Sequence, residues 1–380
     1  MNESLKGPII SRRTFLTWAT VSSLVLPSLL MSGCAAQNSS QKTTPRTITD
    51  MVGRTVTIPA QIHQLYSTGQ PGVVALYMLA PEHLLGWCIK PSTAEAEYLE
   101  QAYLSLPTLG LMQGENNTAN REEIIARAPD VILLMTSLAT TSYREGAIAD
   151  ADSIQKKMGI PTVVADYDLD VMGEAFRFLG DLLDAHERAE KLATYCETVY
   201  ANAREKARSI PPESQVTVYY AQGQNGLQTA PQASAHSEVL DLVGANNVAK
   251  LDFGSSGRVN VDMEQVIIWN PTVIITSYSM SHTSSGDVAF TFIEEGNKSW
   301  AQISAVQSGR IYNTPALPFN WQDMPPSANR FIGITWLGNL LYPHVFTGDI
   351  REETRTYYQL FYRIDLSDEQ LRTLLQNATA

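Results

Sequence analysis

Two segments of this sequence can be laid over each other without a gap, and this internal repeat constrains the fold more than any other feature. Residues 120–133 and residues 262–275 both contain a polar residue, a glutamate, a short helical stretch, a proline and an apolar run. The polar residue is suited to cap a helix, the acidic side chain is favoured in its first turn, and the proline ends it. The repeat therefore predicts two lobes built on one α/β plan.

The segment between the two copies predicts how the lobes are joined. It has no proline from residue 171 to residue 208, and its apolar residues recur at helical spacing. At roughly 1.5 Å per residue, such a helix would be a rod of over 50 Å. We expect an N-terminal lobe over 46–170, a bridging helix over 171–210, and a C-terminal lobe with C-terminal helices over 211–380. The predicted fold class is α/β, with two doubly wound-type lobes joined by a single long backbone α-helix.

The first residues have the plan of an export signal. Arg12 and Arg13 precede an apolar run from Phe15 to Met31, and small residues then lead to Cys34. The segment resembles a twin-arginine signal joined to a lipobox, which implies a signal peptide over 1–33 and lipid on Cys34. Met31 departs from the usual lipobox pattern. An ordinary Sec signal and an uncleaved anchor helix are the alternatives, since the run is close to the length that spans a bilayer.

Residues 34–45 are polar and predict a flexible tether. We therefore expect an extracytoplasmic, membrane-anchored lipoprotein whose membrane contact is made through the lipid. The chain has 27 basic and 39 acidic residues and a net charge of −12, which argues against a nucleic-acid partner. Cys88 and Cys196 lie in apolar and helical stretches and are expected to be buried free thiols, although a disulfide between them stays open in an exported protein.

Several motifs, in their order along the chain, carry a family resemblance. They are Thr49–Pro59, Leu106–Gly110, Glu122–Asp130, Ser237–Val248 and Ser327–Phe331. From residue 46 to about residue 376 the chain resembles the periplasmic binding proteins of iron-siderophore, haem and cobalamin ABC importers. The resemblance implies a ligand cleft between the lobes, an ABC permease and its ATPase as partners, and a monomer.

In that family one glutamate on each lobe docks on the permease, and Glu122 and Glu264 are the matching positions. A charge at the same place in both repeats supports this, although each glutamate could instead only stabilise its own helix start.

In open α/β sheets, ligands bind at the carboxyl ends of the strands, so we place the cleft in the loops that follow them. The candidate cleft residues are Tyr66, Gln113, Ser137, Gln222, His236, Tyr278, Trp321 and Arg330. We expect an exposed Trp321 that offers an aromatic face to a ring-shaped ligand; the alternative is packing under its own loop. The Arg330 guanidinium can donate paired hydrogen bonds to a carboxylate or oxyanion of the ligand, or it can pair with an acidic neighbour in the protein.

The choice of cargo follows from the side chains that are available. A naked metal ion needs converging histidines and carboxylates, and no histidine-rich loop occurs, so we predict no metal site. Amide, hydroxyl and aromatic groups suit a small-molecule metal complex better, and a ferric siderophore is the leading candidate. A corrinoid, haem or a molybdate-type oxyanion are the alternatives within this fold, and a surface adhesin is an alternative function. No nucleophile elbow, P-loop or zinc-protease motif is present, so we expect no enzyme activity and no cofactor apart from the lipid.

Overall fold

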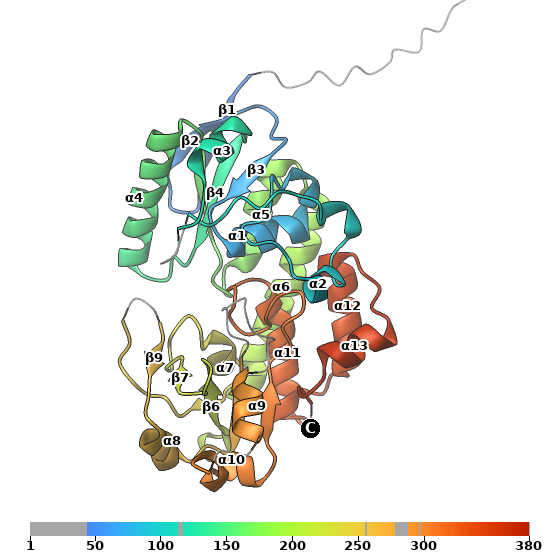
Figure 1. Cartoon of the computed structure of the whole chain (residues 1–380). Coiled ribbons are helices and arrows are strands. Elements are labelled where there is room, and N and C mark those ends of the chain that lie inside the picture. The colour runs from blue at the N-terminus through green and yellow to red at the C-terminus, as the bar shows by residue number, and fades with distance from the viewer. Residues whose placement is uncertain (1–43, 113–116, 255–256, 278–287, 296–297, 380) are drawn as a thin grey trace, which may run out of the picture. The chain divides into compact units, whose positions relative to one another are not determined.

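Three parallel strands form the sheet of the N-terminal lobe in the computed structural model of the protein (Figure 1). They are β3 (Leu65–Ser67), β4 (Val131–Thr136) and β5 (Thr162–Asp166), in the order β3-β4-β5. Nearly all their residues are buried, as is typical of parallel sheets covered on both faces. The structure describes residues 44–112, 117–254, 257–277, 288–295 and 298–379, which all belong to one compact unit.

The helices of this lobe follow its strands. They are α1 (Gln70–Leu79), α2 (Thr93–Ala96), α3 (Arg121–Ala126) and α4 (Thr141–Met158), with 3-10 turns at Pro81–His83 and Gln101–Tyr103. A two-stranded antiparallel ladder, β1 (Arg46–Thr49) with β2 (Thr55–Ile58), precedes them. Gly53 takes a φ of +84° in its turn, a conformation that glycine adopts without strain. The Asp50 carboxylate joins this hairpin to β5 by accepting hydrogen bonds from the backbone N–H groups of Arg54 and Val164.

The repeat forms the same structure in both lobes, as predicted. In the first copy Asn120 caps α3 by accepting hydrogen bonds from the N–H groups of Glu122 and Glu123, and β4 follows. In the second copy Asp262 caps α8 (Met263–Trp269) by accepting from Gln265 N–H, and β10 (Val273–Thr276) follows. Each of the two strands lies inside its sheet with a parallel partner on both sides.

The C-terminal lobe has a second parallel sheet. Its order is β11-β10-β6-β8, with β6 at Thr217–Ala221, β8 at Asn246–Asn247 and β11 at Ile311–Asn313. A short antiparallel ladder joins β7 (Gln228–Thr229) to β9 (Val259–Asn260). The other elements of this lobe are α7 (Glu238–Leu242), α9 (Val288–Glu294), α10 (Ser304–Gln307) and α11 (Asn329–Leu341), with 3-10 turns at Pro212–Ser214 and Trp300–Gln302. A parallel sheet flanked by helices in each lobe confirms the predicted two-lobed α/β class.

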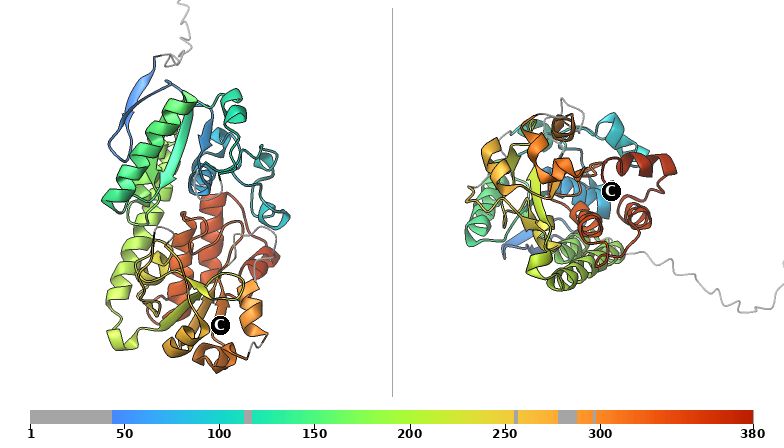
Figure 2. Two further views of the ribbon diagram at one scale, coloured as in Figure 1. Left: turned by 60° about the vertical axis from the view of Figure 1, so that its left-hand side comes forward. Right: turned by 90° about the horizontal axis from the view of Figure 1, so that it is seen from below.

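The predicted bridging helix over residues 171–210 is wrong in its extent, because that segment forms two helices. α5 (Met172–Leu183) ends at Asp184, whose φ of +56° is left-handed, and α6 (His186–Arg208) begins two residues later. Gly180 lies against Ala189 and Gly173 against Glu197, so α5 and α6 pack antiparallel. α5 therefore belongs to the N-terminal lobe. α6, roughly 34 Å long at 1.5 Å per residue, runs from one lobe to the other (Figure 2).

The C-terminal helices form a second connection between the lobes. α12 (Ile350–Tyr362) contacts both α11 and α1, and α13 (Asp368–Leu374) follows it. Arg363, directly after α12, donates to the carbonyl oxygens of Tyr77 and Met78 at 2.9 and 3.0 Å and forms an ion pair with Glu100 of the N-terminal lobe. α6 is thus the long helix that joins the lobes, and α12 and α13 pack across the same junction.

One continuous cluster of buried side chains extends through both lobes. It contains Leu133 of β4, Phe176 of α5, Tyr220 of β6, Ile275 of β10 and Phe361 of α12. A shared core of this kind resists large rotations of one lobe against the other, because such rotations would open packed apolar surface to water. Cys88 and Cys196 are both buried and free, as predicted. Within the described residues, no helix is long and apolar enough to cross a bilayer.

Candidate functional site

A buried carboxylate, Asp323, gathers polar side chains from separate segments of the C-terminal lobe. Its Oδ1 accepts a 2.7 Å hydrogen bond from the Tyr220 hydroxyl, and its Oδ2 accepts one of 2.7 Å from Arg258 Nη2. His236 Nδ1 lies 3.0 Å from the same Oδ2, and the Gln222 amide donates to it at 3.4 Å. These five residues are called the Asp323 cluster. Asp323 itself is fully buried, whereas the side chains of Arg258 and His236 are 19% and 18% exposed.

The charges of the cluster are linked. Burial would raise the pKa of Asp323, but the Arg258 guanidinium and His236 outweigh burial and hold that pKa well below its usual range. The carboxylate is therefore ionised at neutral pH, and it orients a guanidinium and an imidazole that both reach the surface. Guanidinium groups bind carboxylates and oxyanions through paired hydrogen bonds. This arrangement is suited to bind an anion.

Gly257 allows the loop that carries Arg258 to approach the loop that carries His236. Its φ is +65°, and a Cβ at this position would lie 2.8 Å from His236 Cδ2 and 2.9 Å from Ser234 Oγ. The Ser234 hydroxyl donates to the Gly257 carbonyl at 2.6 Å and accepts from His236 N–H at 3.2 Å. Residues larger than glycine would push these loops apart, and with them the side chains of Arg258 and His236.

Two amide side chains at or beside the cluster retain polar atoms that nothing in the described part of the chain satisfies. Gln322 is 1% exposed, and neither its Oε1 nor its Nε2 has a hydrogen-bond partner. Oε1 of Gln222 also has no hydrogen-bond partner. Buried polar groups in folded proteins are almost always hydrogen-bonded. Such atoms, in Gln222 of the cluster and in the residue directly before Asp323, indicate a place where a polar ligand completes the hydrogen bonding.

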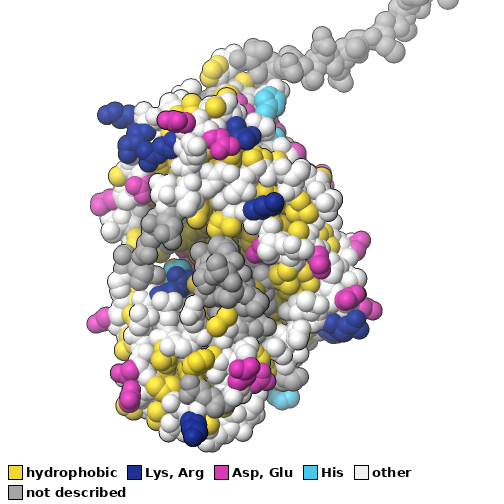
Figure 3. All heavy atoms as spheres, in the orientation of Figure 1, with side chains coloured by type: hydrophobic (Ala, Val, Ile, Leu, Met, Phe, Trp, Pro, Cys, Tyr) yellow, Lys and Arg dark blue, Asp and Glu magenta, His cyan; other side chains and the backbone are white. Residues whose placement is uncertain are grey.

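The cluster lies where ligands bind in open α/β sheets. Gln222 directly follows the carboxyl end of β6, His236 precedes α7, Arg258 precedes β9, and Asp323 lies between β11 and α11. This agrees with the predicted position at the strand ends. Figure 3 shows that the face drawn there is hollowed between its upper and lower halves, and that Lys or Arg and His side chains are visible inside the hollow.

Ser137, predicted for the cleft from the N-terminal lobe, is held by the carboxylate of Asp168. Its hydroxyl donates to Asp168 Oδ2 at 2.9 Å, and the N–H of Leu138 lies 3.2 Å from the same oxygen. Oδ1 of Asp166 accepts from Asp168 N–H at 2.9 Å. Burial, together with the charge of Asp168, raises the pKa of Asp166 to about 7. Ser137 therefore belongs to a polar network at the carboxyl ends of β4 and β5.

Arg330 pairs with an acidic neighbour, which is the alternative considered for it. The side chain is fully buried, and Nη1 lies 2.6 Å from Glu238 Oε2 of α7. The guanidinium also donates to the carbonyls of Tyr167 and Ser327, and Glu238 Oε1 accepts from Leu169 N–H at 3.3 Å. Because Tyr167 and Leu169 follow β5, this network joins the N-terminal lobe to α7 and α11 of the C-terminal lobe.

Tyr66 and Trp321 lie in the core. Tyr66 is fully buried, and its hydroxyl donates to the Gly110 carbonyl at 2.8 Å; burial raises its pKa. Trp321 is also fully buried, edge-to-face with Trp336 at 6.5 Å between ring centroids. The prediction of an exposed Trp321 is wrong, because α11 approaches its backbone so closely that a Cβ on Gly333 would lie 1.9 Å from the Trp321 carbonyl oxygen.

The remaining predicted residues divide into two groups. Glu122 on α3 and Glu264 on α8 are exposed, as a docking role requires. Cys34, Gln113 and Tyr278 lie outside the described residues. Of the predicted cleft residues, the structure thus brings Gln222 and His236 together, whereas Ser137, Arg330, Tyr66 and Trp321 belong to other networks or to the core.

Sequence reasoning missed Arg258, Gln322 and Asp323. Asp323 and Gln322 directly follow the predicted Trp321, so the correct loop was chosen and the wrong side chain within it. Arg258 and Asp323 are 65 residues apart in the sequence, and nothing in either local pattern indicates their ion pair. Within the described residues, no group of three or more His, Cys, Asp or Glu side chains is placed to hold a metal ion.

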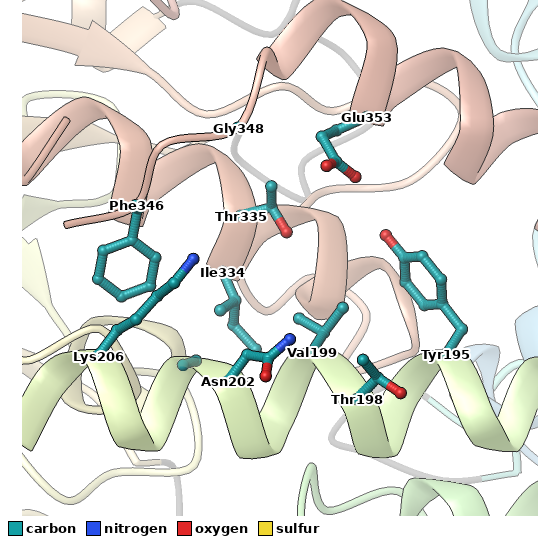
Figure 4. A pocket seen from close by; sticks show the side chains of 11 residues that line it. Tyr195, Thr198, Val199, Asn202, Lys206, Ile334, Thr335, Phe346, Gly348 and Glu353 are labelled. Atoms are coloured by element: carbon teal, nitrogen blue, oxygen red, sulfur yellow. The ribbon is translucent and has the colours of Figure 1, made fainter. Parts of the chain in front are cut away.

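A separate groove lies on the bridging helix. It has a volume of about 260 Å³, and Figure 4 shows side chains of α6 facing side chains of α11 and α12 across it. Lys206 and Tyr195 line the α6 side, and Glu353 and Ile334 the other. None of the Asp323 cluster lines this groove. It is therefore a feature of the interlobe connection and not of the candidate site.

The chain is similar to known proteins along nearly its whole described length. A family model described as periplasmic binding protein matches residues 113–317. The molybdate-binding protein MolA of Haemophilus influenzae is 24% identical over 364 residues, covering 89% of this chain and 97% of MolA. The solved structure of an ABC transporter solute binding protein from Sulfurospirillum deleyianum is 32% identical with a TM-score of 0.77, covering 87% of this chain and 99% of the other.

The molybdate-bound structure of MolA from Haemophilus influenzae has a TM-score of 0.65 and 20% identity, covering 85% of this chain and 99% of that one. At that identity the likeness shows a common fold. The two-lobed architecture described above is therefore shared along nearly the whole length of these solved structures.

Proposed function

Because the chain belongs to the periplasmic binding protein family, we propose that it captures an anionic solute outside the cytoplasm and delivers it to an ABC permease. The solute binds at the Asp323 cluster, beside the carboxyl end of β6, and is released unchanged. The protein is in this proposal a carrier and not an enzyme. The observation that carries the proposal is the partly exposed Arg258 guanidinium, which one ionised and buried carboxylate holds beside the partly exposed His236 imidazole.

We propose a small oxyanion as the solute, with molybdate as the first candidate. An oxyanion has only acceptor oxygens, which match the guanidinium donors of Arg258 and the unsatisfied amide Nε2 of Gln322. A ring-shaped cargo would need aromatic faces, but Tyr66, Tyr220 and Trp321 are fully buried. This burial weakens the case for the ferric siderophore that the sequence favoured. A relative named for molybdate binding, aligned over 89% of this chain, adds support.

A ligand titration tests the choice of cargo. We expect molybdate and tungstate to change the tryptophan fluorescence of the purified protein saturably, with sulfate and phosphate as oxyanion competitors. Ferric enterobactin, an anionic ferric chelate whose charge also suits Arg258, is the second arm, and haemin and cyanocobalamin are the third. If only the chelate binds, the proposed anion site stands and the solute is a siderophore instead of an oxyanion. Binding of cyanocobalamin with no response to any anion would contradict the proposal.

Delivery requires a partner, and we propose that Glu122 and Glu264 dock on basic residues of the permease. Both side chains are exposed, and each lies in the first turn of a helix that the repeat places in one lobe. Opposite charges across an interface steer association and fix its register. Glu122→Gln combined with Glu264→Gln should leave solute affinity unchanged and abolish stimulation of the importer's ATPase. Undiminished stimulation by the double variant would contradict the docking role.

We also propose that the lipid on Cys34 keeps the protein at the membrane surface. The support is the sequence pattern from Arg12 to Cys34. Cys34→Ala should move the protein from the detergent phase to the aqueous phase on Triton X-114 partitioning, and mass spectrometry should find diacylglyceryl on the wild-type cysteine. An unmodified cysteine in the membrane fraction would contradict lipidation and favour an uncleaved anchor helix.

A further inference from the structure

The groove between α6 and the helices α11 and α12 carries opposite charges at its two ends, and it is called the α6 groove. Lys206 and Phe346 form its basic end, and Tyr195 and Glu353 form its acidic end (Figure 4). An apolar wall, which includes Val199 of α6 and Ile334 of α11, lies between the two ends. A ligand that fills the α6 groove therefore meets a cation, an apolar surface and an anion in turn.

The two charges of the α6 groove have no counter-charge. Lys206 Nζ lies 5.1 Å from the centre of the Phe346 ring, a contact that attracts the ammonium group without neutralising it. Within the part of the chain that the structure describes, neither Lys206 nor Glu353 forms an ion pair. In the adjoining hollow along α6, by contrast, Lys191 pairs with Glu187 at 2.7 Å. A ligand that carries both charges would complement the α6 groove.

Tyr195 adds a hydrogen-bond donor at the acidic end. Its hydroxyl oxygen is buried and has no hydrogen-bond partner among the described residues, although buried polar groups are almost always hydrogen-bonded. The ring packs against Phe361 and Tyr357 of α12, with centroids 5.3 and 5.8 Å apart. Burial, together with the charge of Glu353, raises the pKa of this phenol, so it stays a neutral donor. The acidic end can thus donate one hydrogen bond as well as receive a cation.

The spacing of the two ends limits the size of the ligand. Tyr195 and Lys206 are about three turns apart on α6, or roughly 16 Å along the helix axis. Their side chains lean towards each other (Figure 4), so the ends of the groove are closer than this. Three residues of extended peptide span roughly 10 Å. The volume of about 260 Å³ lies just below the roughly 300–1,000 Å³ of ligand pockets, so the groove fits a small molecule.

We propose that the α6 groove is a second ligand site, separate from the Asp323 cluster, and that it takes a tripeptide with free ends and apolar side chains. The ammonium group of the peptide pairs with Glu353, and its first carbonyl accepts the hydrogen bond of the Tyr195 hydroxyl. Its side chains pack on the apolar wall, and its carboxylate pairs with Lys206. Hydrogen bonds between charged groups are the stronger ones, and two of them fix the direction of the peptide.

Isothermal titration calorimetry of the purified protein with alanyl-leucyl-alanine tests this site. N-acetylation removes the ammonium group of the peptide and C-amidation removes its carboxylate, and each should weaken binding about tenfold. Glu353→Gln should bind the free and the acetylated peptide equally, and Lys206→Met should bind the free and the amidated peptide equally. Tyr195→Phe should weaken binding of all three peptides about threefold. Lys191→Met is the matched control on α6, because this exposed lysine already has a partner, and it should bind as the wild type does.

Three results would overturn the inference. The first is no saturable binding of the free peptide at millimolar concentration, and the second is equal affinity of the wild type for all three peptides. The third is loss of peptide binding in Arg258→Met, because the peptide would then occupy the Asp323 cluster. Glu353 also lies in the first turn of α12, where an acid stabilises the helix. If Glu353→Gln lowers the urea midpoint but still distinguishes the free from the acetylated peptide, the role of Glu353 is structural and the inference fails. The delivery function stands or falls separately, because it depends on the other site.

Discussion

Replacing Asp323 by asparagine probes the ion pairs on which the candidate site depends. Asparagine is close to isosteric, and its Oδ1 can still accept the 2.7 Å hydrogen bond from Tyr220. Its amide nitrogen would replace Oδ2 and would then face Arg258 Nη2 at 2.7 Å and His236 Nδ1 at 3.0 Å. The variant therefore sets an amide donor against a guanidinium donor and leaves a guanidinium without its carboxylate in a largely buried position.

The expected size of the effect follows from this burial. Removing one partner of a buried ion pair costs about 3–5 kcal/mol, because the other charge stays desolvated. The Arg258 side chain is 19% exposed, so we expect the lower end, about 3 kcal/mol at pH 7. Arg258→Gln should remove most of that penalty when it is combined with Asp323→Asn. The coupling energy of the double-mutant cycle should therefore exceed about 1.5 kcal/mol.

Urea unfolding followed by circular dichroism measures the four free energies of unfolding in this cycle. A matched cycle at Glu123 and Arg127, whose side chains are 41% and 40% exposed, provides the control. That helical surface pair should couple by about 0.5 kcal/mol or less. If the Asp323–Arg258 coupling is no larger than that of the surface pair, the cluster is not a desolvated ion pair and the reasoning fails. The contribution of Asp323 should also disappear as pH falls below about 4, because its pKa is lowered on folding.

Three further substitutions test other parts of the structure. Asp166 has a pKa raised to about 7, so the free energy of unfolding should fall as pH rises from about 4 to 7 and stay level above pH 7. Asp166→Asn should remove that fall when unfolding curves are measured across pH. An unchanged pH profile in the variant would contradict the raised pKa. Gly257→Ala should weaken anion binding at least about threefold, because the new Cβ displaces His236; unchanged affinity would show that the loop adapts. Arg330→Met should lower the unfolding free energy by about 1–3 kcal/mol, since Glu238, whose side chain is 30% exposed, loses its charged hydrogen-bond partner. An effect below about 0.5 kcal/mol would contradict the interlobe network.

Local signals explain which parts of the fold could be predicted. The repeat depends on caps, prolines and short apolar runs, and its helix and strand were predicted correctly in both lobes. The break between α5 and α6 was missed because Asp184 ends the helix in the left-handed conformation where glycine is usual. The C-terminal helices were assigned to one lobe because contacts such as Arg363 with Tyr77 join residues far apart in the sequence.

The candidate site was likewise predicted only where local sequence patterns indicate it. Gln222 and His236 could be predicted, because loops after parallel strands are where ligands bind. Arg258 and Asp323 could not, because an ion pair between distant loops leaves no local pattern. Trp321 was expected to be exposed because its loop looked polar and rich in proline, yet close approach of α11 at Gly333 buries it. Sequence thus predicted the edge of the sheet at which the site lies, and the structure identified the charges there.

The most direct test of the central claim is the affinity of Arg258→Met for molybdate, measured by isothermal titration calorimetry beside the wild type and Arg127→Met. Hydrogen bonds to a charged group are worth about 1.5–3 kcal/mol, so losing the guanidinium should weaken binding about 10- to 150-fold. Arg127→Met removes an exposed arginine at the C-cap of α3 and should bind as the wild type does. Equal affinities for the wild type and Arg258→Met would contradict an anion site at the Asp323 cluster.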